Sequence, residues 1–268
     1  MVVGLRGGSP IGLLWRRRAL LGSLVWRDLR TRYAGSAAGL LWAVGNPLLQ
    51  IAILTTVFSL VLKVRFGSDP NTPFAVTLAW GLFPWIALQE GVARATTALL
   101  DNGVLIKRMA FPPEIIVVQP ILSALVQQGI ALVLLTVLMP FFGVPLRMSV
   151  LAAPLPLLLQ TTLAIGLGWI LAVLHVYVRD TAQLVVAALQ AWFYLTPIVY
   201  SVDAAPESLR TVLMANPMSG VVATLRSVAL GAPMSWGAIA WSGVVAGGAL
   251  LLGARVMRRA RREIADLV

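Results

Sequence analysis

Few side chains in this sequence of 268 residues could take part in acid–base or ion chemistry. Glu90 and Arg94 are one helical turn apart, so they can neutralise one another as an intramembrane charge pair. That pair either stabilises the end of a helix or has a functional role. His175 is the only histidine, and we expect it to pack or to lie at an interface. Proton or ion coupling usually needs more ionisable groups than these.

The common catalytic and nucleotide-binding spacings are absent from the sequence. It contains no H-E-x-x-H, no G-x-S-x-G, no cluster of carboxylates with the spacing of metal ligands, and no cysteine. Neither Lys63 nor Lys107 completes the G-x-x-x-x-G-K-[ST] loop that would hold ATP. We therefore expect no catalytic residue, no metal and no cofactor in this chain. If the chain is part of a pump, another protein must therefore supply the energy.

Aromatic side chains gather around a proline late in the chain. Trp192, Phe193, Tyr194 and Tyr200 surround Thr196-Pro197. Aromatic rings stack on the apolar faces of sugars, so this cluster could line a path for a glycan. The alternative is an aromatic belt at the membrane–water interface, which many membrane proteins have.

The composition indicates that these residues are carried by membrane helices. Hydrophobic residues make up 59% of the chain, charged residues only 12%, and the mean hydropathy is +0.88. We predict an all-α integral membrane protein of a single domain. Gly243-x-x-x-Gly247 is a spacing at which spanning helices often pack. Six apolar windows have the length of a membrane span: about 37–62, 74–99, 115–142, 150–176, 182–200 and 236–254.

The basic residues predict the orientation of these spans. The chain has 21 Lys and Arg against 10 Asp and Glu. The basic residues interrupt apolar runs instead of forming a basic polar domain, and this pattern argues against nucleic acid as a partner. With both termini in the cytoplasm, fifteen basic residues fall inside, Arg94 lies within a span, and five fall outside. The five outer ones are Lys63, Arg65, Arg147, Arg210 and Arg226.

Residues 13–33 are expected to form an amphipathic helix on the inner membrane surface. Leu21, Val25 and Leu29 would share its apolar side, and Asp28 and Arg32 are spaced to pair. The alternative is a solvated basic segment that only sets the topology. The arginines expected to contact lipid headgroups or a phosphate of the cargo are Arg16, Arg17, Arg18, Arg27, Arg30 and Arg32.

Two connecting segments have unusual composition. The inner segment 101–114 ends with Pro112-Pro113, which predicts a compact helix held beneath the membrane. Its apolar residues are expected to be exposed, either as a docking surface for a partner or in the lipid interface. The outer segment 201–235 is broken by Pro206 and Asn216-Pro217, and we expect two short re-entrant helices there. The proposed docking residues are Leu105, Ile106, Lys107, Arg108, Met109 and Phe111.

Several short motifs occur in the order seen in the permease subunits of type 2 ABC exporters, in the branch that exports polysaccharides and polyol phosphates. Residues 27–33 resemble the opening R-D-x-x-x-R-Y of that family, and residues 102–114 resemble its N-x-x-L-I-x-K-x-x-F-P-x-E loop, with Ala110 and Pro113 departing from the usual pattern. The resemblance covers about residues 27–232. Its other parts are Leu40-Leu41-Trp42-Ala43-Val44, Asn46-Pro47-Leu48, Gly81-Leu82-Phe83-Pro84-Trp85, Arg179-Asp180, residues 194–200, Asn216-Pro217 and Arg226.

This resemblance implies a homodimer with a separate pair of nucleotide-binding subunits, which would bind the ATP and magnesium. The inner segment 101–114 would be the coupling helix, and Trp42 would join the aromatic residues of the glycan path. The expected cargo is a lipid-linked polysaccharide of the O-antigen, capsule or teichoic-acid type, exported across a bacterial inner membrane. The alternatives are an ABC exporter of drugs, lipids or peptides and, from a different class, a membrane enzyme that acts on lipid-linked sugars.

Overall fold

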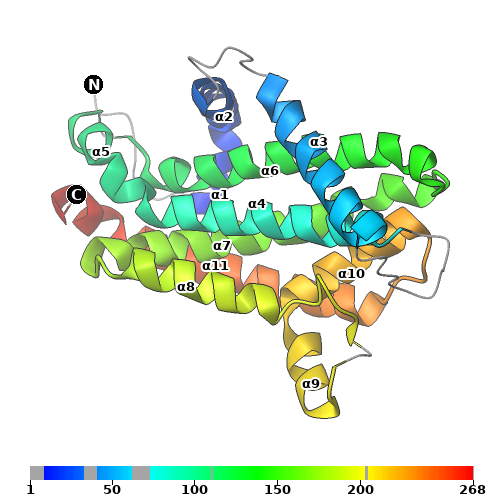
Figure 1. Cartoon of the computed structure of the whole chain (residues 1–268). Helices are drawn as coiled ribbons and strands as arrows, with labels where there is room; N and C mark the ends of the chain where they lie inside the picture. The colour runs from blue at the N-terminus through cyan, green and yellow to red at the C-terminus, as the bar shows by residue number, and fades with distance from the viewer. Residues whose placement is uncertain (1–8, 33–40, 62–72, 110, 203–204, 268) are drawn as a thin grey trace.

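The computed structural model describes residues 9–32, 41–61, 73–109, 111–202 and 205–267, and no strand occurs among them. Its centre is a bundle of long helices in which α4 (Phe74–Asp101) lies between α6 (Pro113–Leu138) and α7 (Pro154–Tyr177). The helix α11 (Trp236–Leu267) packs along α7 (Figure 1). Proline occupies the first turn of α6 and α7, where its missing N–H costs no helical hydrogen bond.

The core of the bundle combines large aromatic side chains with close backbone contacts. Trp80, Trp85 and Trp169 are almost fully buried. A Cβ atom added at Gly166 would lie 2.4 Å from the backbone of Ala249, and one at Gly253 would lie 2.4 Å from the carbonyl oxygen of Gly166. Only glycine lets α7 and α11 approach this closely. The expected spacing at Gly243 and Gly247 does not supply this contact, because a Cβ at Gly247 meets nothing within 4 Å.

Within the described residues, three helical segments are long and apolar enough to cross a membrane: Pro113–Phe142, Met148–Tyr177 and Trp236–Arg261. They coincide with the third, fourth and sixth predicted spans. The first two include the short 3₁₀ helices η3 (Met139–Phe142) and η4 (Met148–Ala152).

The remaining predicted spans differ from this simple pattern. The first begins in residues outside the described part, and its described portion is α3 (Trp42–Leu54) followed by the π-helical turn η2 (Thr55–Val61). The second is α4, which has the necessary length but carries Glu90 and Arg94. The fifth, predicted over 182–200, is shorter than expected. Helix α8 (Thr181–Tyr194) has 14 residues, or about 21 Å at 1.5 Å per residue.

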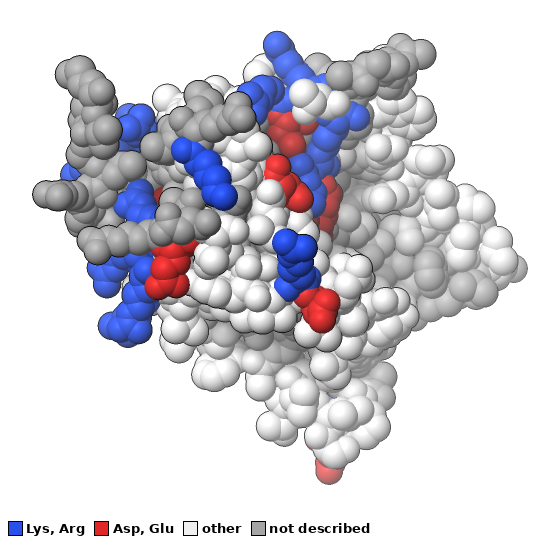
Figure 2. All heavy atoms as spheres, turned by 90° about the vertical axis from the view of Figure 1, so that its left-hand side faces the viewer, with Lys and Arg blue, Asp and Glu red and all other residues white. Residues whose placement is uncertain are grey.

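The two ends of the bundle have different character. The first, here called the α5 end, holds the short helix α5 (Gly103–Met109) and the C-terminal part of α11 (Figure 1). Lys and Arg side chains gather on this end, as Figure 2 shows. The second, here called the α9 end, holds α9 (Glu207–Ala215) and α10 (Pro217–Leu230), which replace one long connection by two short helices.

The amphipathic segment expected over 13–33 forms two helices, α1 (Pro10–Arg16) and α2 (Arg18–Arg32). Ser9 caps α1, since its Oγ accepts a hydrogen bond of 3.0 Å from the backbone N–H of Gly12. Leu21, Val25 and Leu29 are buried on one side of α2, which packs against α6. The apolar side of α2 therefore faces this protein's own helices.

Candidate functional site

The segment predicted to dock a partner is α5, and its apolar side chains do not all face outward. Ile106 is only 5% exposed, and Leu105 and Phe111 pack partly against the core. Val104 is 69% exposed, and Lys107 is also exposed. The expectation of an exposed Ile106 is therefore wrong, because a helix with one face against the bundle must turn some of its apolar residues inward.

Only part of the predicted docking set can be placed on this helix. The side chains of Arg108 and Met109 lie outside the described residues. Asn102 precedes α5, and its Nδ2 donates to the carbonyl oxygen of Ala98 at 2.9 Å. This bond fixes the turn between α4 and α5. The outward surface of α5 that the structure describes is thus formed by Val104 and Lys107.

A buried ion pair holds α5 and its neighbours in place. The carboxylate of Glu114, at the start of α6, lies 3.2 Å from Nε of Arg261 on α11, and Glu114 is only 1% exposed. The carbonyl oxygen of Glu114 accepts a bond of 3.3 Å from the indole N–H of Trp169. Sequence reasoning treated Glu114 only as part of a motif. Its position directly after Pro112-Pro113 was the available signal, but nothing local identified Arg261 as its partner.

The predicted pair of Glu90 and Arg94 is part of a larger network. Their closest charged atoms are 3.6 Å apart, whereas Arg94 binds Asp28 of α2 at 2.7 Å. Arg32 contacts the carboxylates of both Asp28, at 3.4 Å, and Glu90. Its guanidinium also donates to Oε1 of Gln127 at 2.8 Å. Two separate i,i+4 pairs in the sequence thus become one group of four charges that ties α2 to α4 and α6.

The charge of Asp28 is stabilised by this arrangement. Burial alone would raise the pKa of Asp28. The hydrogen bond and charge of Arg94 outweigh that effect, with help from Ser123 and Arg32, and hold the pKa below its usual value. Asp28 therefore remains an anion at neutral pH and keeps its bonds to both arginines.

The arginines expected to contact inner-leaflet headgroups fall into two groups. Arg32 is engaged in the network just described, and its assignment as a headgroup contact stays a prediction. Two of the others lie over tryptophan rings, Arg18 at 5.3 Å from Trp15 and Arg30 at 4.8 Å from Trp26. Trp15 and Trp26 are themselves exposed. The exposed arginines of α1, α2 and their junction are Arg16, Arg17, Arg18, Arg27 and Arg30.

Sequence reasoning missed two further arginines near this surface. A pocket of about 500 Å³ lies between α1 and α11, and Arg255 and Arg258 line it together with apolar residues such as Leu251 and Leu252. A guanidinium pair beside apolar walls suits the headgroup and the upper chain of an anionic lipid. Sequence reasoning counted both arginines only among the fifteen basic residues on the cytoplasmic side.

The predicted aromatic path divides into packed and exposed residues. The indole N–H of Trp192 donates to Oδ1 of Asn216 at 2.9 Å, and its ring meets Trp85 edge-on at 5.7 Å. Phe193 also packs against Trp85, at 5.8 Å. Tyr194, in contrast, is 67% exposed. Trp192 and Phe193 are therefore held mainly by packing, which leaves Tyr194 as a ring available to a ligand.

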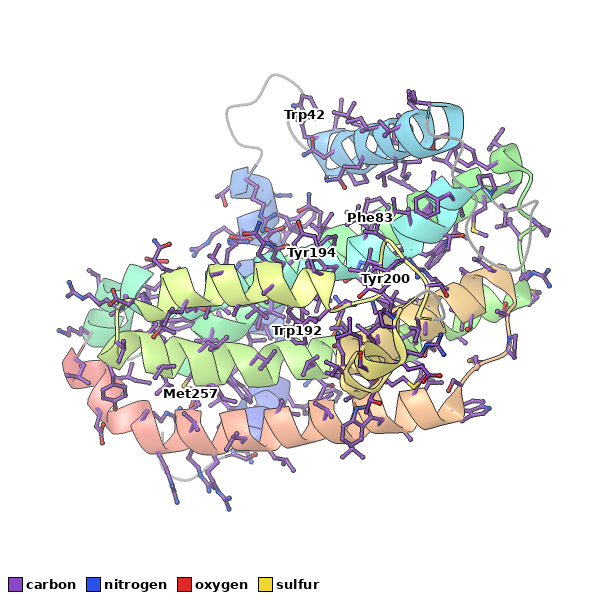
Figure 3. All side chains as sticks on the ribbon, turned by 60° about the horizontal axis from the view of Figure 1, so that its bottom comes forward. Trp42, Phe83, Trp192, Tyr194, Tyr200 and Met257 are labelled. Atoms are coloured by element: carbon purple, nitrogen blue, oxygen red, sulfur yellow. The ribbon has the colours of Figure 1, made fainter. Side chains whose placement is uncertain are left out.

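The other two aromatic candidates lie at different places. The hydroxyl of Tyr200 donates to the carbonyl oxygen of Tyr194 at 2.7 Å, which keeps these two residues together. Trp42 stands apart from them at the start of α3 (Figure 3). Its ring is 42% exposed. Within this one chain, the structure does not bring Trp42 to the aromatic cluster.

Asn216 organises the break between α8 and α10. Its Oδ1 accepts from the backbone N–H of Met218 at 3.0 Å, as an N-cap of α10. Its Nδ2 donates to the carbonyl oxygen of Leu195 and to Oγ1 of Thr196, both at 2.9 Å. With the bond from Trp192, both ends of the amide are used.

Arg226 satisfies backbone groups at the same break. Its guanidinium donates to the carbonyl oxygens of Thr77 at 3.0 Å, Pro197 at 2.9 Å and Ile198 at 2.6 Å. The regular helix ends before Pro197, so the carbonyls of Pro197 and Ile198 need a donor from elsewhere. Arg226 was expected as one of five outer basic residues and as part of the family resemblance, and in the structure it joins α10, α4 and the end of α8.

Two further expectations concern ionisable groups. His175 is 7% exposed on α7, and its Nδ1 has no hydrogen-bond partner in the described part of the chain. Among the described residues, no group of three or more His, Asp or Glu side chains could hold a metal ion.

Comparisons with known proteins agree on one family. The model of the ABC-2 type transporter family matches residues 19–230. The O-antigen export system permease protein RfbA of Myxococcus xanthus is 31% identical over 217 residues, which are 80% of this chain and 82% of that protein. Its namesake in Klebsiella pneumoniae is 28% identical over 78% of this chain and 80% of that protein.

A more distant relative has a related name. The polysialic acid transport protein KpsM of Escherichia coli is 23% identical over 78% of this chain and 80% of its own length. The matched region contains the charge network, α5, Glu114, the aromatic residues and Arg226. Together with the three apolar helices, these matches identify a multi-pass membrane protein. The chain belongs to the ABC-2 type transporter family.

Proposed function

We propose that this chain is the membrane permease subunit of an ATP-driven exporter that moves a lipid-linked polysaccharide from the cytoplasmic to the outer side of the cell membrane. The observation that carries the proposal is the match over 80% of the chain to an O-antigen export permease. The cargo would be of the O-antigen, capsule or teichoic-acid type. The separate ATPase subunits would bind ATP and magnesium.

The geometry of α5 supports coupling to such an ATPase. Val104 and Lys107 face outward at the end where Lys and Arg gather, and Ile106 anchors the helix in the core (Figure 2). The ion pair of Glu114 with Arg261 fixes α6 and α11 beside it. A partner that pushes on α5 would therefore act on the whole bundle.

The proposed topology has six spans in the inner membrane, with both termini in the cytoplasm. The charged α5 end would face the cytoplasm, and α9 and α10 would lie in the outer leaflet. Helix α8 would complete its crossing through the broken segment held by Asn216 and Arg226. Two copies would assemble with two ATPase subunits around the glycan path, to which Tyr194, Tyr200 and Trp42 would contribute.

Export can be tested by deleting, in the host cell, the gene that encodes this chain. We expect the surface polysaccharide to disappear and its lipid-linked form to accumulate on the cytoplasmic side, and mass spectrometry of extracted lipids would identify it. A surface polysaccharide that persists without the chain contradicts the proposal. Accumulation of another compound, such as a drug or a peptide, would instead favour the other exporter class.

A single-residue variant tests the glycan path. Tyr194→Ala removes an exposed ring and should reduce export of the polysaccharide severalfold while the assembled exporter still forms. Tyr177→Ala removes a half-exposed ring from α7 and is the matched control. Equal export by both variants and the unaltered chain would remove Tyr194 from the path.

A further inference from the structure

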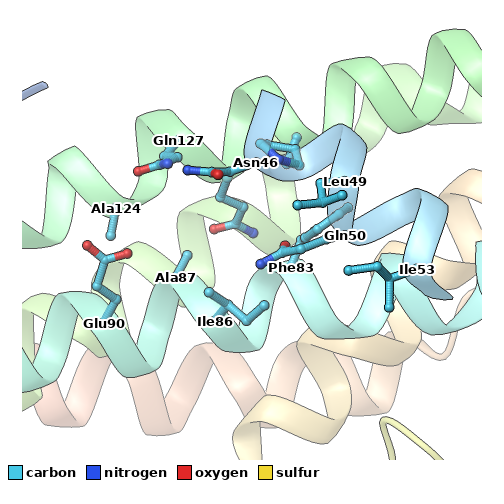
Figure 4. A pocket seen from close by; sticks show the side chains of 13 residues that line it. Asn46, Leu49, Gln50, Ile53, Phe83, Ile86, Ala87, Glu90, Ala124 and Gln127 are labelled. Carbon is cyan, nitrogen blue, oxygen red and sulfur yellow. The ribbon is translucent and has the colours of Figure 1, made fainter. Parts of the chain in front are cut away.

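A pocket with an unusual number of side-chain amides lies between α3, α4 and α6 (Figure 4). Its volume is about 290 Å³. That is near the lower limit of roughly 300 Å³ for small-molecule sites, and it suits one sugar ring better than a long chain. The polar side chains that line it are Asn46, Gln50, Glu90, Gln127 and Gln128.

These polar side chains differ in whether their donors and acceptors are already hydrogen-bonded. Gln128 is buried and exchanges bonds of 3.0 and 2.9 Å with Gln160. Gln127 accepts from Arg32. The side chains of Asn46 and Gln50, in contrast, enter no hydrogen bond with another described residue, and both are exposed on α3. Two amides are thus left with unused donors and acceptors at the mouth of the pocket.

The spacing of these two amides gives the pocket a polar wall. Asn46 and Gln50 are one turn apart on α3, and both line the pocket with Glu90 on α4 (Figure 4). A polar group that faces hydrocarbon without a partner is costly, so polar residues of spanning helices normally face a cavity, a ligand or another helix. Their place on the apolar helix α3 therefore calls for a hydrogen-bonding occupant.

The charges around the pocket indicate the chemistry of that occupant. Glu90 is the only acidic residue among the described residues of the lining, and Arg32 and Arg94 both contact its carboxylate. None of the described lining residues is an arginine or a lysine. Amides donate and accept hydrogen bonds equally well, as sugar hydroxyls do. The described lining thus suits a neutral polyhydroxyl group, and the nearby guanidinium of Arg32 is already bonded to Glu90 and Gln127.

Apolar residues beside the amides indicate how the occupant would be oriented. Leu49 and Ile53 line the same opening and are 54% and 52% exposed. They continue the apolar surface of α3 next to the polar wall. A sugar could enter between the helices while an attached acyl chain remains against Leu49 and Ile53 in the bilayer.

We propose that this pocket is a binding site for a neutral sugar headgroup of a glycolipid, with Asn46 and Gln50 bonding its hydroxyls. The inference deepens the proposed function, because it assigns a sugar-binding site on the membrane flank of the permease. It concerns a place separate from the aromatic residues around Pro197 and requires neither the ATPase nor transport.

The test uses the full chain in lipid nanodiscs and a glucosyl-diacylglycerol that carries a photoreactive diazirine on its sugar. After illumination, mass spectrometry should find cross-links on peptides from α3, α4 and α6. An excess of plain glucosyl-diacylglycerol should remove them, and the same excess of phosphatidylglycerol should not. Equal competition by the two lipids overturns the proposal.

Two variants with a matched control test the residues. The double variant Asn46→Leu with Gln50→Leu should lower the cross-link yield about tenfold, as expected for the loss of two hydrogen bonds. Ala87→Leu should also lower it by filling the pocket without touching the amides. Gln183→Leu removes an exposed amide from α8 and should leave the yield unchanged.

The remaining outcomes are equally decisive. Unchanged cross-linking in both pocket variants contradicts the proposal. A double variant that changes the oligomeric state, measured by light scattering, would show that the amides serve contacts between copies and would also overturn it. Cross-linking that depends on the two amides, in a chain that exports no polysaccharide, would leave the pocket standing and remove the proposed function. Normal export by a chain that never cross-links would support the proposed function and overturn the pocket.

Discussion

The two ends of the bundle satisfy their buried polar groups by different means. At the α5 end, guanidinium groups meet carboxylates, as in the network around Asp28 and in the pair of Glu114 with Arg261. At the α9 end, Arg226 meets backbone carbonyls that a proline break leaves exposed. Charge pairs join helices that are already complete, whereas Arg226 replaces missing helical hydrogen bonds. Arginine therefore has a different structural role at each end.

The largest effect is expected from Arg226→Leu. The substitution leaves the carbonyl oxygens of Pro197 and Ile198 without this donor, and each buried unsatisfied group costs about 1–3 kcal/mol. For the two groups together we expect a loss of about 4 kcal/mol, seen as a much lower midpoint of thermal unfolding in detergent and a poor yield. Arg147→Leu, at an exposed residue near the same end, is the control. Equal destabilisation by both variants would mean that Arg226 does not hold the break.

Arg261→Leu should have the next largest effect. It leaves the Glu114 carboxylate buried without its counterion, which costs about 3 kcal/mol for a well-buried group. Adding Glu114→Gln to Arg261→Leu should recover part of the stability, because a neutral amide tolerates burial better. Arg259→Leu, on the exposed side of α11, serves as the control. If the second substitution gives no recovery, the charge of Glu114 is not the cause.

A smaller effect is expected in the network of α2 and α4. The side chains of Asp28 and Arg94 are 17% and 37% exposed, so solvent screens their attraction. A double-mutant cycle with Asp28→Asn and Arg94→Gln should give a coupling energy of about 1 kcal/mol. Chemical denaturation in mixed micelles would measure it. A coupling energy near zero would mean that this network is only a surface contact, unlike the bonds of Arg226.

Val104→Asp should leave stability unchanged within about 0.5 kcal/mol, because the side chain is exposed. It should nevertheless weaken co-purification with the ATPase subunit severalfold, since a charge replaces an apolar contact on α5. Val178→Asp, at another exposed valine, is the matched control. If the ATPase binds both variants as well as the unaltered chain, α5 is not the docking surface.

The pattern of apolar residues predicted the spans at 115–142, 150–176 and 236–254 because hydropathy alone sets the length of a membrane helix. It overestimated the fifth span, since Trp192 to Tyr200 is apolar throughout but Thr196-Pro197 ends the helix. The prediction of α5 as a short helix agrees with the structure, but the orientation of Ile106 is opposite to the one expected. Which side of a short apolar helix is buried depends on the helices around it.

The sequence by itself determined the membrane class, the short inner helix before the double proline and the lack of a nucleotide-binding loop, because these depend on composition and local spacing. Only the tertiary structure decided which distant residues meet. It joined Glu114 to Arg261, Asp28 to Arg94, Arg226 to Pro197, and Gly166 to Gly253. It also brought Asn46 and Gln50 to the pocket beside α4 and α6. Such pairings depend on how helices pack, and the sequence of one helix does not contain the position of its neighbour.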